Sequence, residues 1–346
     1  MSKTLADIGE FGLIHRIQTL VAKRGVQSPD ITLGMGDDAA AFRPHEGYEL
    51  LVTCDTMVEG RHFLKGAITA RELGKRAMVM NISDIGAMGG RPLYALVSLG
   101  LRADTLVGDV EEMYQGFIEE LNPFQAAIIG GNITKSEHDL FVDITLIGEV
   151  ERGALVRRST AREGDAVLVT GYPGQAAAGL QLLLNAKGHE PFQDHPLVNA
   201  YNRPDHRAKE GRAMALSGYI TSMIDISDGF LGDLGHICEE SHVGVELLQK
   251  RLPVSEHLNQ ITLPPGKTIY DLVMGNSDDY ELIITCRPQN VGDVRSVISS
   301  ISPVPITEVG RVIPQSEGIQ LVLLDGTKMN MIPKGWDHFN ESSPKQ

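Results

Sequence analysis

Residues 50–101 read LLVTCDTMVEGRHFLKGAITARELGKRAMVMNISDIGAMGGRPLYALVSLGL and set the fold class of the chain. The run LLVTC at Leu50–Cys54 is apolar and rich in β-propensity, which is typical of a buried strand. Apolar residues then recur at helical spacing over Thr69–Met88, and a second apolar run follows at Leu93–Leu101. Strand, helix and strand in this order favour an α/β or α+β architecture.

The same alternation continues toward the C-terminus. In the first half we expect a helix at Leu106–Leu121, a strand at Ala126–Gly130 ending in a Gly-Gly turn, and a strand at Leu140–Val150. In the second half we expect a helix near Gln175–Leu184, a polar loop at Lys187–Arg203, and strands at Ala166–Gly171, Tyr219–Ile226, Glu281–Cys286 and Ile319–Leu324. The charged segment Glu151–Asp165 separates the two halves, so the sequence predicts two domains, residues 1–150 and 151–346.

Composition excludes several classes of protein. The 346 residues carry a net charge of −14, which disfavours a nucleic-acid-binding surface because such a surface needs a basic patch. No apolar run approaches the length of a membrane span, and the N-terminus lacks a signal-peptide pattern. The three cysteines, Cys54, Cys238 and Cys286, form no CxxC pair. We therefore expect a cytoplasmic protein that binds neither nucleic acid nor membranes.

Aspartates cluster at four places where strands end or the chain turns. The clusters are GMGDDAA with Asp37 and Asp38, CDT with Asp55, NISDIGAMGG with Asp84, and IDISDGFLGD with Asp225, Asp228 and Asp233. Carboxylates at this density repel one another, and a buried one is costly unless it meets a cation. Mg²⁺ prefers oxygen ligands and is usually held by a few carboxylates together with substrate phosphates. The pattern therefore favours a magnesium-dependent enzyme that handles ATP.

Each of these motifs also has a structural interpretation. Asp-Gly and Gly-Asp-Asp commonly mark turns or helix N-caps. Asp84 lies among apolar residues of a predicted helix, which favours metal ligation over a structural hydrogen bond. A lone histidine such as His62 is more often structural than functional. Backbone amides at Gly130–Gly131 or at Gly171–Gly174 could bind phosphate, or these glycines could simply form turns. No P-loop, dinucleotide-binding or protein-kinase signature is present.

Seven motifs together resemble the thiamine-monophosphate kinases, in the order found in that family and over nearly the whole chain. They are GEFGLI at Gly9–Ile14, GMGDDAA, CDTMVEGRHF, NISDIGAMGGRP, the Gly130-Gly131 pair, IDISDGFLGDLGHI, and KGWDHF at Lys334–Phe339. This family belongs to a larger group built like aminoimidazole ribonucleotide synthetase. The acidic clusters are shared by the whole group, whereas His62 and the GWDHF motif are specific to the thiamine-monophosphate kinases.

The resemblance implies a two-domain homodimer. The N-terminal domains, each a mixed sheet with helices, would pair into a barrel-like core that binds ATP and Mg²⁺, and each C-terminal domain would be a layered α/β domain that completes the cleft for ATP and substrate. The implied reaction transfers the γ-phosphoryl group of ATP to thiamine monophosphate and gives thiamine diphosphate and ADP, with several Mg²⁺ ions.

The resemblance also assigns site residues. Asp38, Asp84, Asp225 and Arg158 would be catalytic, and the Mg²⁺ ligands would be Asp38, Thr53, Cys54, Asp55, Asp84, Asn132, Asp225 and Asp228. ATP would contact Tyr114, Gly130, Gly131, Asn132, Arg158 and Ser227. Thiamine monophosphate would contact His62, Asp278 and Trp336, although the single tryptophan could instead be a packing residue.

Two positions depart from the family pattern. Asn132 stands where an aspartate is usual, so one Mg²⁺ position has a neutral oxygen in place of a carboxylate. The usual Gly-Gly-Glu-Asp-Tyr is Asn276-Ser277-Asp278-Asp279-Tyr280, so a shorter carboxylate takes the place of the substrate contact.

Two rival functions remain at the level of sequence. One is another ATP-dependent enzyme of the same superfamily, such as a selenophosphate synthetase or a hydrogenase-maturation enzyme; the chain lacks the cysteine-bearing N-terminal loop of the former and the cysteine-containing tail of the latter. The other is a non-catalytic protein that binds Mg²⁺ or nucleotide. Formation of thiamine diphosphate with release of ADP would separate the three.

Overall fold

The computed structural model describes residues 3–186 and 194–333. These fall into two compact units: one runs to Ile85 and resumes over Gly90–Arg152, and the other comprises Gly86–Gly89 and the chain from Gly153 onward. The division after Arg152 lies beside the domain boundary expected near residue 150. Trp336 and the KGWDHF motif lie outside the described residues.

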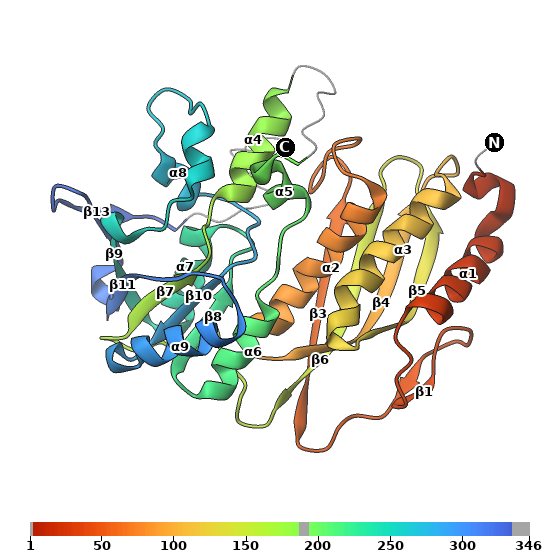
Figure 1. The fold of residues 1–346 in the computed structure, drawn as a ribbon, viewed down its shortest axis with the longest axis horizontal. Helices are drawn as coiled ribbons and strands as arrows, with labels where there is room; N and C mark the ends of the chain where they lie inside the picture. Colours follow the sequence, from red (N-terminus) through yellow and green to blue (C-terminus); the bar gives the residue numbers. More distant parts are fainter. Residues whose placement is uncertain (1–2, 187–193, 334–346) are drawn as a thin grey trace. The chain divides into compact units, whose positions relative to one another are not determined.

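The first unit is built on a four-stranded mixed sheet (Figure 1). Its strands lie in the order β3-β6-β4-β5, with β4 and β5 parallel and the other neighbours antiparallel. A short hairpin, β1-β2, stands apart from this sheet. The elements are α1 (Leu5–Arg24), β1 (Ile31–Leu33), β2 (Ala41–Phe42), β3 (Tyr48–Val58), α2 (Ala70–Ala87), β4 (Arg91–Leu101), α3 (Val107–Leu121), β5 (Ala127–Lys135) and β6 (Phe141–Glu151).

Helices α2 and α3 pack closely against each other on one face of this sheet (Figure 1). Glycines make the close approach possible, because a Cβ atom on Gly74 would lie 2.1 Å from the carbonyl oxygen of Met113 and one on Gly116 would lie 2.2 Å from that of Arg71. At the surface of the pair, Glu119 of α3 accepts from Arg71 and lies 2.8 Å from Nζ of Lys75. The predicted helices at Thr69–Met88 and Leu106–Leu121 are confirmed.

Strand β3 has one face that is open to solvent. Side chains alternate along a strand, and Leu51 and Met57 are buried on the helix side. On the other side Leu50 is 46% exposed and Val52 is 67% exposed. The strand expected at Leu50–Cys54 is therefore present, but the expectation that it is buried was wrong, because side chains on one face of β3 are exposed.

Strand β5 corrects a second expectation. Gly130 and Gly131 do not form a turn after a strand but lie within β5, which continues to Lys135. The register with β4 shifts just before Gly130, as at a β-bulge. A Cβ atom on Gly131 would lie 1.9 Å from the carbonyl oxygen of Val97, so glycine is required there by the close approach of the neighbouring backbone.

The second unit is a seven-stranded sheet with helices, in the order β13-β12-β9-β11-β7-β10-β8. Only the β12-β9 pair is parallel. Its elements are β7 (Ala166–Thr170), α4 (Gln175–Asn185), α5 (Pro196–Asn202), α6 (Ala208–Ser217), β8 (Ile220–Asp225), α7 (Phe230–Ser241), β9 (Val243–Leu248), α8 (Ile269–Val273), β10 (Leu282–Cys286), α9 (Val291–Ile301), β11 (Ile306–Pro314), β12 (Ile319–Val322) and β13 (Lys328–Met331). The short 3₁₀ helices are η1 (Asn122–Phe124), which belongs to the first unit, and η2 (Arg158–Thr160), η3 (Gln249–Arg251), η4 (Glu256–Gln260), η5 (Pro288–Asn290) and η6 (Gln315–Glu317).

Most of the second-half elements expected from sequence are present, with one error. The loop expected at Lys187–Arg203 contains helix α5, which begins with Pro196 in its first turn. The expected α/β fold class with two units and mixed sheets is confirmed. Among the described residues, no helix combines the length and apolar character that crossing a membrane requires.

Candidate functional site

A cavity of about 1020 Å³ lies in the first unit. Its walls are α1, Tyr114 of α3, the chain from Gly34 to Phe42, and strands β4, β5 and β6. Five residues expected from sequence to bind ATP or Mg²⁺ line this one cavity: Asp38, Tyr114, Gly130, Gly131 and Asn132. Tertiary structure thus brings together residues that are up to 94 positions apart in the sequence.

The cavity combines apolar and polar surfaces. Ile14 of α1, Ile129 and Ile147 supply apolar walls, whereas Asp38 and Asn132 supply oxygen atoms. Tyr114 is buried and packs edge-on against Phe117, with ring centroids 5.2 Å apart. Burial raises the pKa of the Tyr114 phenol, which therefore stays protonated and able to donate a hydrogen bond at neutral pH. Such a lining suits a ligand with a flat apolar part and a charged part.

The loop that carries Asp37 and Asp38 is anchored to the sheet through His45. Nδ1 of His45 lies 2.7 Å from a carboxylate oxygen of Glu149, and Nε2 lies 3.1 Å from Asp30. Glu149 is fully buried and also accepts from Arg91 at 2.8 Å. Hydrogen bonding to Glu149 and then to Asp30 raises the pKa of His45. The network holds both ends of the Asp38 loop against strands β4 and β6.

Thr53 and Asp84 meet on the helix-covered face of the same sheet. The Thr53 hydroxyl donates a hydrogen bond to the Asp84 carboxylate, and both side chains are half-buried. Asp55 lies two residues farther along β3 and therefore faces the same side as Thr53. The expected ligands of the first unit thus form two groups: Thr53, Asp55 and Asp84 on one face, and Asp38 and Asn132 in the cavity on the other.

Cys54 faces the open side, opposite to Thr53. Its thiol lies 3.3 Å from an oxygen of Asp143, and the hydroxyl of Thr145 lies 3.5 Å from its sulfur. A sulfur atom is a poor ligand for a hard cation such as Mg²⁺. Asp143, which the sequence did not single out, is the carboxylate that lies beside Cys54.

His62 has a structural contact at the end of β3. Its Nδ1 accepts a hydrogen bond from the backbone amide of Val58, with the two nitrogens 3.0 Å apart. The ring is half-buried.

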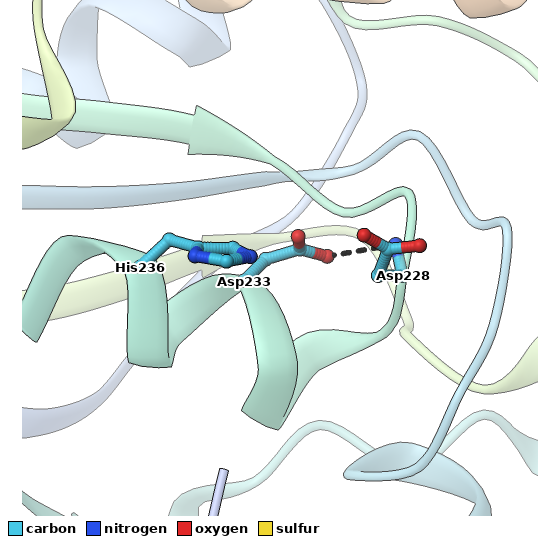
Figure 2. A group of neighbouring side chains, drawn as sticks. All are labelled: Asp228, Asp233 and His236. Carbon is cyan, nitrogen blue, oxygen red and sulfur yellow. Dashed lines mark hydrogen bonds between the residues drawn. The ribbon is translucent and has the colours of Figure 1, made fainter. Parts of the chain in front are cut away.

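In the second unit, Asp225 is the last residue of β8, and Asp228 lies in the loop that leads into α7. Figure 2 shows Asp228 beside Asp233 and His236 of α7, with one ligand atom of each within 4.8 Å of the others. Among residues 3–186 and 194–333, this is the one group of three or more acidic, histidine or cysteine side chains with such spacing. Asp38, Asp55 and Asp84 of the first unit form no such group.

Asp233 accepts three backbone hydrogen bonds. The amides of Ser227, Asp228 and Gly229 donate to its Oδ2 at 3.0, 3.0 and 3.1 Å. Burial, followed by the charge of Asp228, raises the pKa of Asp233 to about 7 although these bonds favour the ionised form.

Arg158, Ser227 and Asp278 lie at accessible positions of the second unit. Arg158 begins η2, and its exposed segment is held by the hydroxyls of Ser222 and Ser241, which donate to its carbonyl oxygen. The Ser227 side chain is exposed and Asp278 is half-buried. Both Arg158 and Ser227 can therefore reach a ligand in solvent.

The glycines at Gly171–Gly174 do not provide free amides for phosphate. The Gly171 amide donates to the carbonyl of Pro305 at 2.9 Å, and the Gly174 amide donates to Asp279 at 2.6 Å. Asp279 also accepts from Ala176, and Ser277 accepts from Ala177. Protein oxygens thus accept from the amides of Gly171, Gly174, Ala176 and Ala177, which disfavours a phosphate site there.

The donor set fits Mg²⁺. Asp84 with Thr53, Asp38 with Asn132, and Asp228 offer the oxygen atoms that this ion prefers. A bound cation would offset the charge of the half-buried Asp84 and the repulsion between Asp228 and Asp233, since like charges at this spacing repel.

Sequence reasoning missed three supporting residues: His45, Asp143 and Asp279. Each contacts a partner about 90 or more positions away in the chain. No local motif signals such contacts. The sequence marks Asp233 only as part of an acidic cluster, and its position one helical turn after the Asp228-Gly229 pair was the available signal.

Comparison with known proteins agrees with this geometry. Models described as AIR synthase related protein, N-terminal domain and C-terminal domain match residues 36–150 and 162–322. The thiamine-monophosphate kinase of Aquifex aeolicus (strain VF5) is 36% identical over 336 residues, covering 97% of this chain and 99% of that protein.

Two solved structures are similar along the whole chain. The thiamine-monophosphate kinase from Stenotrophomonas maltophilia K279a has a TM-score of 0.78 and 31% identity, covering 92% of this chain and 97% of that one. AaThiL complexed with AMPPCP and TMP has a TM-score of 0.73 and 33% identity, covering 98% of this chain and 100% of that one. With both domain models matched and relatives aligned from end to end, this chain belongs to the thiamine-monophosphate kinase family.

Proposed function

We propose that this protein is a phosphotransferase that moves the γ-phosphoryl group of ATP to thiamine monophosphate, giving thiamine diphosphate and ADP. The observation that carries the proposal is the cavity of the first unit, where Asp38, Tyr114, Gly130, Gly131 and Asn132 converge. A similar protein, AaThiL, has been solved with AMPPCP and TMP, an ATP analogue and a thiamine monophosphate ligand. The family membership supports the same reaction.

The chemistry suits residues that neutralise charge. The attacking phosphate oxygen is already anionic, so the reaction needs in-line positioning and charge neutralisation more than a strong base. Mg²⁺, when bound, offsets the negative charge of the triphosphate and the acceptor. In the first unit Asp38 and Asn132 would hold one ion in the cavity, and Thr53, Asp55 and Asp84 would hold another on the helix-covered face. In the second unit Asp225 and Asp228 would hold a further ion. Cys54 would take part only through its backbone oxygen.

Arg158 and Ser227 would contact the nucleotide phosphates. Arginine keeps its charge at any physiological pH, and its flat guanidinium matches phosphate oxygens. The exposed position of both residues supports this assignment. His62 and Asp278 would contact thiamine monophosphate, together with Trp336.

We also propose that the protein is a homodimer joined through the open face of the four-stranded sheet. Leu50 and Val52 expose large apolar surfaces on this face, and such surface is costly in water. A second copy of the same sheet would bury both residues. The second copy would then also shield the cavity on this face from solvent. Exclusion of water would strengthen the electrostatic interactions between the cavity residues and a bound ligand.

The test of the function is an assay of the purified full chain with magnesium–ATP and thiamine monophosphate. We expect stoichiometric ADP and thiamine diphosphate, and no turnover after chelation of divalent cations. ADP formed only with a different acceptor would favour another enzyme of the superfamily. Binding of ATP without any turnover would identify a non-catalytic protein.

A single substitution tests the proposed role of Asp84. Asp84→Asn keeps the shape of the side chain and an oxygen that accepts from Thr53, but it removes the charge that Mg²⁺ requires. We expect turnover to fall by about 100-fold or more with an unchanged melting temperature. Asp109→Asn, an exposed aspartate of α3 in the same unit, is the control and should leave turnover unchanged. Equal rates for the two variants would remove Asp84 from the site.

A further inference from the structure

We propose that Asp233 is a positioning residue for phosphoryl transfer: it fixes the loop Ser227–Gly229 and thereby orients the carboxylate of Asp228 and the hydroxyl of Ser227. This inference rests on the proposed function, in which those two side chains meet Mg²⁺ and phosphate. Asp233 itself lies beneath the loop, with 2% of its surface exposed.

Three consecutive amides point at one oxygen of Asp233. The nitrogens of Ser227, Asp228 and Gly229 lie 3.0, 3.0 and 3.1 Å from Oδ2 (Figure 2 shows the bond from Asp228). Amides at the start of a helix have no partner within the helix, and a concave row of them is a site that attracts anions. Here the anion is a side chain from the first turn of the same helix, α7.

The rest of the loop is held by the chain on either side. Ile226 donates to the carbonyl of Glu281 and accepts from the amide of Tyr280, both at 2.8 Å. Gly229 has a φ of 112°, and a Cβ atom there would lie 2.1 Å from the carbonyl of Gly275. The backbone before and after the loop is therefore fixed, and the Asp233 carboxylate fixes the three residues between.

The hydrogen bonds from the loop amides to Asp233 limit which groups of the loop can bind a nucleotide. Because Asp233 takes all three N–H groups, a phosphate meets the side chains of Ser227 and Asp228 and not the backbone. Residues that orient a ligand in this way typically change metal affinity by about 10–100-fold when they are replaced. Asp233 would thus act through Asp228, without touching the substrate.

Two substitutions separate positioning from direct ligation. Asp233→Ala removes the acceptor of all three amides, whereas Asp233→Asn keeps an oxygen that accepts them but removes the charge. We expect the Mg²⁺ concentration for half-maximal binding of AMPPCP to rise by about 10–100-fold in Asp233→Ala and to stay close to the wild-type value in Asp233→Asn. A similar loss in both variants would mean that the charge itself is needed, and would overturn positioning.

Asp279→Ala is the matched control. Asp279 is a half-buried carboxylate that also accepts backbone amides at the start of a helix in the same unit. We expect this variant to be destabilised like Asp233→Ala but to keep the wild-type Mg²⁺ dependence. An Asp233→Ala protein that folds and keeps that dependence would overturn the inference.

Hydrogen exchange of the wild-type protein gives a readout that does not depend on any variant. The amides of Ser227, Asp228 and Gly229 should be protected in the absence of nucleotide, although Ser227 is exposed. Rapid exchange at all three would contradict the proposal. Failure of the proposed function looks different: the wild type would not phosphorylate thiamine monophosphate, while the amides would remain protected and AMPPCP binding would still depend on Asp233.

Discussion

His45 shows how one residue sets the position of a site that it does not enter. Its two ring nitrogens connect Asp30, which precedes the Asp38 loop, to Glu149 of the sheet. The pKa of His45 is raised above 6.5 in the folded protein. The stabilisation of the folded protein by protonated His45 and its two carboxylate partners is therefore fully present below pH 6.5. It is lost as the pH rises through the higher pKa that His45 has in the folded protein.

A pH series of hydrogen exchange tests this role. His45→Gln keeps a polar side chain but cannot carry the charge, so we expect the amides of residues 34–42 to exchange about fivefold faster than in the wild type at low pH, equivalent to about 1 kcal/mol. The difference should shrink as the pH rises and His45 loses its proton. A constant ratio across the series would mean that the charge of His45 contributes nothing.

At the scale of elements, α4 depends on a distant carboxylate. Asp279 accepts from Gly174 and Ala176, and Ser277 accepts from Ala177, so residues just before β10 satisfy the first amides of the helix. Capping interactions of this kind contribute about 1–2 kcal/mol. The neighbouring Asp278 is the residue that we propose contacts the substrate.

Substitution of the two adjacent aspartates should therefore separate stability from binding. Asp279→Ala should lower the melting temperature by about 3–6 °C. Asp278→Asn should leave the melting temperature close to that of the wild type and raise the KM for thiamine monophosphate about tenfold, or about 1.4 kcal/mol. Calorimetry and steady-state kinetics on both proteins measure these effects. A lowered melting temperature for Asp278→Asn with an unchanged KM would reverse the assignment.

At the scale of the whole molecule, the open sheet face is the feature that a single chain leaves incomplete. Strand β3 alternates between a side covered by helices and a side where Val52 is 67% exposed. A charged residue at Val52 would be tolerated in a monomer, because it would lie in water. In a dimer joined through this face it would be buried without a partner.

Val52→Asp should therefore convert the proposed dimer into a monomer, which sedimentation equilibrium measures. Activity should fall over the same range of protein concentration in which the dimer dissociates. Leu324→Asp is the control, since Leu324 is 68% exposed in the second unit and should leave the assembly unchanged. A wild-type protein that is monomeric at micromolar concentration would contradict the dimer without affecting the assignment of the reaction.

The sequence by itself determined the α/β class, most of the helices and strands, the two-part organisation and the family. These follow from local periodicity and from motifs such as GMGDDAA and IDISDGFLGD, whose residues are neighbours in the chain. It misplaced Gly130–Gly131 and α5, because a glycine pair or a proline marks a turn only when the surrounding backbone does not prescribe another conformation.

Only the tertiary structure decided which residues meet. It gathered Asp38, Tyr114 and Asn132 around one cavity, paired Thr53 with Asp84 on the opposite face, and placed Asp233 beneath the loop of Asp228. In the tertiary structure Asp279 also accepts from an amide at the start of α4, and Val52 is exposed. The physical reason is that hydrogen-bond partners and burial depend on contacts between distant segments, and local sequence patterns do not encode those contacts.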